Sequence, residues 1–127
     1  MTPLMRAAKS GETRMVFDLL QAGAPLDTAN SDGNNALWLA CVGADSETID
    51  VLIRAGIDLD HQNDSGATCL MYAASTGKHL VVEQLLNAGA DARLKTLDNF
   101  TALDMAATID CLNLLRRAEK AVPETES

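Results

Sequence analysis

The apolar and polar positions of this chain recur with a fixed period. Residues 2–8 spell TPLMRAA, and three similar stretches follow as NALWLAC, TCLMYAA and TALDMAA. A leucine shared by all four stretches recurs every 33 residues, at Leu4, Leu37, Leu70 and Leu103. A glycine recurs with the same step, at Gly23, Gly56 and Gly89. Two markers with one period indicate an internal repeat.

Each unit predicts two short helices. A Thr or Asn precedes the first apolar run of each unit, where its side-chain oxygen can accept a hydrogen bond from an unpaired amide. These expected N-caps are Thr2, Asn35, Thr68 and Thr101. A second apolar run ends at the repeated glycine, which suits the left-handed conformation that follows many helices. Turns that contain Gly33 or Gly66 then lead to the next unit.

Stacking explains why the pattern repeats. Helices of about eight to ten residues are marginal alone, because nucleation is costly. Each unit therefore needs a neighbouring unit to bury its apolar face. The sequence predicts an all-α solenoid of stacked helix-turn-helix units with short β-hairpin loops. The expected domain spans residues 1–120, with repeats over 1–33, 34–66, 67–99 and 100–120, and a disordered acidic tail over 121–127.

These units resemble ankyrin repeats. The family's T-P-L-H-x-A stretch matches TPLMRAA except at the histidine, and GADAR and GIDLD are similar to its Gly-Ala-Asp-Val-Asn ending. We expect packing to order the loops more than polar bonds, because the histidine position holds Met5, Trp38, Met71 and Asp104. The last unit is about three residues shorter between its helices, and it resembles a C-terminal capping repeat.

The resemblance implies an ankyrin-repeat α-solenoid that binds another protein and has no chemistry of its own. Binding would use the concave face of the first helices and the hairpin tips. Apolar anchors inside a polar rim are typical of interface hot spots. On this chain the candidates are Leu39, Tyr72 and Met105 on the helices and Asp32, Asp64, Leu97 and Phe100 on the hairpins. The three helix candidates recur every 33 residues and should lie side by side.

Two further aromatic residues have two interpretations each. Trp38 is expected to fill space between repeats rather than to contact a partner. Phe17 stands where the next two units have Asp50 and Glu83, so it either packs at the end of the stack or contacts a partner or a missing segment. The first unit lacks a preceding hairpin, which with Phe17 favours an alternative function as a regulatory fragment of a larger multidomain protein. The start at Met1 and the capped C-terminus weigh against that alternative.

The chain is acidic, with 18 acidic and 10 basic residues and a net charge of −8. We expect no binding to nucleic acid or to an anionic membrane, because both require a basic surface. A partner protein with a basic or mixed surface and an apolar anchor fits this charge better. An alternative is that the charge only keeps an elongated domain soluble.

Candidate chemistry is sparse. The cysteines Cys41, Cys69 and Cys111 lack paired spacing, so we expect neither a disulfide framework nor a zinc site. A signal-peptide core and a long apolar run are absent from the sequence, which predicts a cytoplasmic protein.

Other motifs fail at required positions. Residues 58–69 are similar to a calcium loop, but Asn63 replaces its glycine and Cys69 its final glutamate. His61 and His79 lack neighbouring ligands at metal-binding spacing and are interpreted as surface residues. We therefore expect a monomer with no enzymatic activity, no cofactor and no metal.

Overall fold

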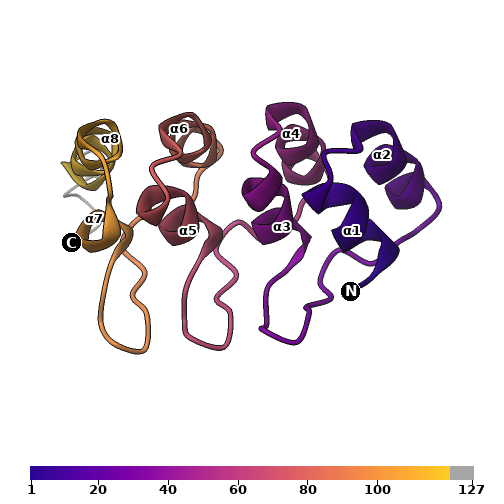
Figure 1. Cartoon of the computed structure of the whole chain (residues 1–127), viewed down its shortest axis with the longest axis horizontal. Coiled ribbons are helices and arrows are strands. Elements are labelled where there is room, and N and C mark those ends of the chain that lie inside the picture. Colours follow the sequence, from indigo (N-terminus) through magenta and orange to yellow (C-terminus); the bar gives the residue numbers. More distant parts are fainter. Residues whose placement is uncertain (121–127) are drawn as a thin grey trace.

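The computed structural model describes residues 1–120, and the tail expected over 121–127 lies outside them. Within the described residues, eight helices form four consecutive pairs and no strand is present (Figure 1). The all-α solenoid expected from the sequence is confirmed. The helices are α1 (Pro3–Lys9), α2 (Thr13–Gln21), α3 (Ala36–Gly43), α4 (Ser46–Arg54), α5 (Cys69–Ser75), α6 (His79–Asn87), α7 (Ala102–Met105) and α8 (Ile109–Lys120).

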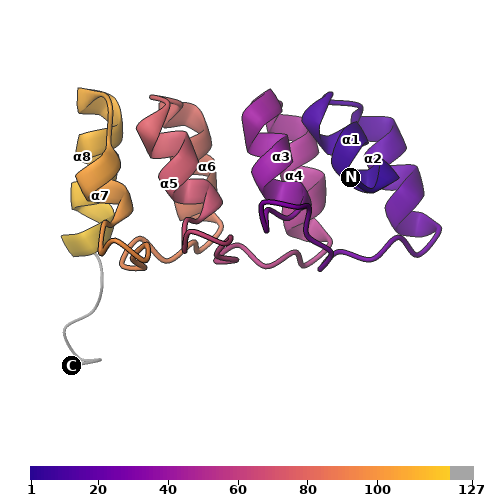
Figure 2. The same cartoon turned by 60° about the horizontal axis from the view of Figure 1, so that its bottom comes forward.

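The helices form two layers. Figure 1 shows the inner helices α1, α3, α5 and α7 beside the long loops, and the outer helices α2, α4, α6 and α8 above them, away from the loops. Figure 2 shows the same order along the stack, with the loops gathered at one edge. Each inner helix contacts the next inner helix. The outer helices pack as α2 with α4 and α6 with α8, whereas α4 and α6 make little contact and are bridged where the Gln84 side chain donates to the Ser46 carbonyl (2.9 Å).

The expected N-caps are confirmed in all four inner helices. Each cap side chain accepts a hydrogen bond from the backbone amide three residues later, at 3.1–3.3 Å. In the last unit the Asp104 carboxylate also accepts from the Thr101 amide (2.9 Å) and completes a capping box. Asp104, which replaces the family's histidine, therefore accepts a hydrogen bond at the start of its own helix.

Small side chains allow the helices to approach closely. Alanine and cysteine occupy the buried side of the inner helices next to the repeated leucine, and α1 and α3 are especially close at Gly43. A Cβ atom added to Gly43 would lie 2.5 Å from the Lys9 carbonyl oxygen. The core thus lies between the layers and between adjacent units. Its buried repeated positions include Leu4, Leu37, Leu70, Ala8, Cys41 and Ala74.

The long loops are hairpins without a β-ladder. One backbone hydrogen bond of 2.9 Å closes each loop between residues four apart, with the amides of Asn30, Asn63 and Thr96 as donors. Neighbouring loops are also joined directly. The Asp64 amide donates to the Asp32 carbonyl (3.2 Å), and the Leu97 amide donates to the Ser65 carbonyl (3.0 Å).

Glycine permits this close stacking of the loops. Gly66 has a φ of +78°, and an added Cβ would lie 2.9 Å from the Leu97 amide nitrogen. Gly33 has the same role, since its added Cβ would lie 2.8 Å from the Asp64 amide nitrogen. Asn99 takes the equivalent position in the third loop, with a φ of 75°. Within the described residues no fourth loop packs against it, so its side chain meets no such neighbour.

The fourth unit differs from the others. Its inner helix α7 has only four residues, because Ala106 leaves the helical conformation with a ψ of 122°. The amide of Ala107 instead donates to the Ala74 carbonyl at the end of α5 (3.0 Å). The outer helix α8 is the longest of the described helices, with 12 residues. The shortened link that the sequence indicates thus joins a short inner helix to a long outer one.

All three cysteines are buried free thiols. A hydrogen bond with Cys69, followed by burial, raises the pKa of Cys41 well above its usual value. The folded protein therefore holds this proton more tightly than the unfolded chain does. The resulting stabilisation is complete below the unfolded thiol pKa of about 8.5 and is lost as the pH rises through the folded pKa.

We expect a Cys41→Ala variant to lose less stability than the parent protein between neutral and alkaline pH. Alanine suits the site, because Ala8 and Ala74 occupy its equivalents in the neighbouring units. Urea unfolding of both proteins at the two pH values measures the difference, and titration of groups that do not contact Cys41 cancels in the comparison. An identical pH dependence for the two proteins would contradict this prediction.

Candidate functional site

The inner face comprises the exposed side of the inner helices together with the three hairpin loops. Of the three helix positions expected there, Tyr72 and Met105 are half-buried. Leu39 is only 5% exposed and belongs to the core, so its expected placement as a surface contact is wrong. The reason is its place in α3, which packs between α1 and α5 and uses the leucine to fill the interior.

The sequence predicts that Leu39 lies beside Tyr72, but the structure has the ring of Trp38 beside Tyr72 instead. The rings of Trp38 and Tyr72 lie 5.2 Å apart between centroids, with their planes tilted by 42°. The separation of the ring centroids lies within the range of about 4.5–7 Å that is typical of aromatic pairs in contact. Trp38 packs against the core and so fills space between repeats as expected, but it remains half-buried like Tyr72.

Sequence reasoning missed this pairing. Trp38 and Tyr72 are 34 residues apart, one more than the repeat period. An alignment of the repeats therefore does not place them at equivalent positions. The available signal was their type and position. They are the only Trp and the only Tyr of the chain, and both lie in the first turn of an inner helix.

The hairpin candidates lie on the surface. Asp32 and Asp64 are exposed at the tips of the first two loops. Leu97 and Phe100 in the third loop are 79% and 52% exposed, although a loop tip is usually polar. The loop residues are fixed in place, because the Phe100 amide donates to the Thr96 hydroxyl (3.1 Å) and Leu97 bonds to the second loop.

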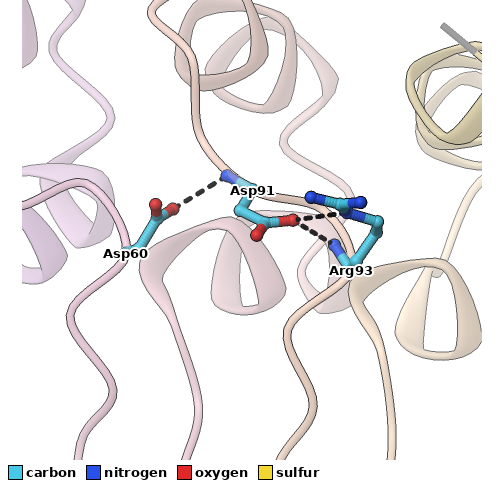
Figure 3. A network of polar contacts seen from close by, with 3 residues as sticks. All are labelled: Asp60, Asp91 and Arg93. Atoms are coloured by element: carbon cyan, nitrogen blue, oxygen red, sulfur yellow. Dashed lines mark hydrogen bonds and ion pairs between the residues drawn. The ribbon is translucent and has the colours of Figure 1, made fainter. Parts of the chain in front are cut away.

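A network of carboxylates fixes the base of the loops (Figure 3). The Asp60 carboxylate accepts from the Asp91 amide of the next unit (2.8 Å). The Asp91 carboxylate accepts from the amide (2.9 Å) and the Nε (3.3 Å) of Arg93. Exposed ion pairs stabilise little, so the main effect of the network is to position the two segments.

Side chains of the second loop bond to the loops on either side. His61 Nε2 lies 2.6 Å from the Gly33 carbonyl oxygen, which corrects its interpretation as a simple surface residue. The Gln62 side-chain amide donates to the Lys95 carbonyl (3.0 Å), and that of Asn63 donates to Asn34 Oδ1 (2.8 Å). The expectation that packing orders the loops more than polar bonds is therefore incomplete. His79 is exposed at the start of α6.

The N-terminal end of the stack exposes apolar side chains. Met15 of α2 is 50% exposed, whereas its equivalents Thr48 and Val81 in the next units are buried. The Thr48 hydroxyl lies 2.8 Å from the Thr13 hydroxyl of the preceding unit. Phe17 is also exposed, and it lines a groove between α2 and α4 next to the ion pair of Asp50 with Arg54 (2.9 Å). The Phe17 ring is therefore partly packed against α4 and partly accessible to a partner.

The comparisons with known proteins agree with this architecture. The family model described as ankyrin repeats (3 copies) matches residues 1–63 and 42–124, so the chain belongs to the ankyrin repeat family. A crystal structure of the ankyrin repeat domain of Bcl-3, a member of the IkappaB protein family, superposes with a TM-score of 0.86 and 28% sequence identity. The match covers 91% of this chain and 51% of the Bcl-3 chain, so this chain spans about half of that domain. No curated protein sequence matches the chain.

Family membership defines a class of function. Ankyrin repeat domains are typically protein-interaction modules and are generally non-catalytic. Within residues 1–120, no group of three or more histidine, cysteine or acidic side chains could hold a metal ion. None of the helices described has the length and apolar composition required to cross a bilayer.

Proposed function

We propose that this chain is a non-catalytic module, acting as a monomer, that binds a partner protein through its inner face. The observation that supports this most directly is the cluster of accessible apolar groups beside acidic loop tips. Tyr72 and Met105 are partly accessible on the inner helices, and Leu97 and Phe100 are exposed on the adjoining third loop. Such groups inside a polar rim are suited to become buried in a protein interface.

The rigidity of the loops supports the same function. Backbone hydrogen bonds join each loop to the next, and side chains of the second loop add further bonds. A surface that is already ordered loses less conformational entropy when it binds. The loop tips are therefore prepared to form an interface without rearrangement.

A double variant, Tyr72→Ser with Phe100→Ser, tests this proposal. Affinity capture from a cell lysate, followed by mass spectrometry, would compare it with the parent protein. We expect a specific partner to be retained by the parent and lost by the double variant. Leu80→Ser is the matched control, because Leu80 is 69% exposed on the outer helix α6. A partner lost by the control and kept by the double variant would reject the inner face.

A second candidate function is a regulatory module within a larger multidomain protein. The exposed Met15 favours it, because the equivalent Thr48 of the second unit is buried and contacts Thr13 of the preceding unit (2.8 Å between hydroxyl oxygens). A segment packed on that end would cover Met15 in the same way. A partner that survives the inner-face double variant but is lost on Met15→Lys would support this second function.

A further inference from the structure

We propose that the Trp38–Tyr72 pair receives an arginine side chain from a basic segment of the partner. The acidic loop tips then bind the remaining positive charges of that segment. This inference rests on the proposed function of the inner face and names the chemistry of its ligand. It replaces the simple apolar anchor that the sequence predicts with a cationic one.

The two rings are placed to form a docking surface. Trp38 lies in the first turn of α3 and Tyr72 in the first turn of α5, so both directly follow hairpin loops. Their contact spans two units, and each ring keeps part of its surface accessible. A guanidinium group that lies over an aromatic face within about 6 Å is attracted by the negative charge of that face.

The acidic residues of the loops divide into two groups. The first group stabilises the loops, because the carboxylates of Asp58, Asp60 and Asp91 each accept a hydrogen bond from a backbone amide. The second group comprises the tips, where the exposed carboxylates have no hydrogen bond or ion pair within residues 1–120. This second group is Asp32, Asp64 and Asp98.

The charge of the loops favours a basic ligand. Segments 22–35, 55–68 and 88–101 together contain seven acidic residues and two basic ones, Arg93 and Lys95. Arg93 is already paired with Asp91, so it does not offset the tip carboxylates. Phosphate or an acidic peptide would be repelled here, whereas a basic segment would be attracted.

Arginine fits this combination better than lysine. Its guanidinium is planar, stacks on aromatic rings and can donate two parallel hydrogen bonds to a carboxylate. A lysine ammonium is more strongly hydrated and lacks the planar shape. An aliphatic anchor would contact the rings but would gain nothing from the carboxylates.

The basic residues of α1 set the direction of the segment. Arg6 and Lys9 are exposed on this helix, one unit before Trp38. A basic segment anchored at the rings is therefore repelled from α1 and directed toward the second loop, whose segment 55–68 has three acidic residues and no lysine or arginine. Asp64 is then the carboxylate that contributes most.

The test uses the full chain and a random peptide library. Peptides that bind the immobilised protein are selected, sequenced and synthesised. Binding is followed by the fluorescence of Trp38, which is the only tryptophan of the chain and so reports directly on the site. We expect enrichment of arginine, a shift in Trp38 emission on binding, and a loss of affinity of about tenfold when that arginine is replaced by citrulline, its uncharged analogue.

Two variants of Tyr72 distinguish the effect of its aromatic face from the effect of its size. Tyr72→Phe keeps the aromatic face and should bind the selected peptides nearly as well as the parent. Tyr72→Leu keeps an apolar side chain but removes the face, and we expect about a tenfold loss. Asp64→Asn should weaken binding and reduce its dependence on salt, while Leu80→Ala should change neither.

Each outcome is decisive. Aliphatic-anchored peptides without arginine, lost on Phe100→Ser, would overturn this inference and leave the inner face as the binding site. Peptides that bind the Tyr72→Leu and Phe100→Ser variants as tightly as the parent would overturn both proposals. Failure to recover any peptide with arginine also overturns the inference.

Discussion

Replacing Leu37 with alanine is expected to lower the free energy of unfolding by about 2–5 kcal/mol, the range for large cavities in protein cores. Leu37 is fully buried in α3, where it is the repeated leucine of the second unit. The substitution removes contacts within that unit and at its interfaces with neighbouring units. Urea unfolding followed by circular dichroism measures the effect.

The fourth unit provides a matched control for this substitution. Leu103 holds the same repeat position in α7, but it is only partly buried. Leu103→Ala should therefore cost clearly less than Leu37→Ala. Equal losses for the two variants would mean that burial between units does not determine the stability of this position.

Substitution of Gly66 by alanine has the second large effect. The left-handed conformation costs a residue with a side chain about 1–2 kcal/mol. The added Cβ would also lie 2.9 Å from the Leu97 amide nitrogen, and such overpacking costs about 1–3 kcal/mol more. We expect the free energy of unfolding to fall by the sum of the two, measured by the same urea titration.

Gly56→Ala measures the conformational cost alone, so its difference from Gly66→Ala gives the cost of the contact between loops. Gly56 has a φ of +90°, but no heavy atom lies within 4 Å of its added Cβ. Its variant should lose only the conformational part. The prediction fails when Gly66→Ala proves no more destabilising than Gly56→Ala, because the contact between loops would then carry no measurable cost.

Local features of the fold were predictable because short segments determine them. The N-caps bond to amides only three residues away, and the glycines after α2, α4 and α6 adopt positive φ values of 90° to 104° as the sequence indicates. The period then fixes the order of the units. Such features require no knowledge of how one unit sits on the next.

The candidate site was less predictable, because it depends on the geometry between units. The period aligns Leu39 with Tyr72, but packing between α1 and α5 buries Leu39 and brings Trp38 to the ring of Tyr72. The bond of His61 to the first loop likewise spans two units. An exact repeat identifies equivalent positions, but it does not indicate which of them remain exposed.

The weak contact between α4 and α6 has a mechanical consequence. The outer helices hold the first two units together and the last two units together, whereas the middle is bridged on that side by the bond of Gln84 to Ser46. We therefore expect the stack to bend most easily between the second and third units. The Trp38–Tyr72 contact joins the inner helices across this same boundary, so we expect a ligand held there to restrict the bending of the four units.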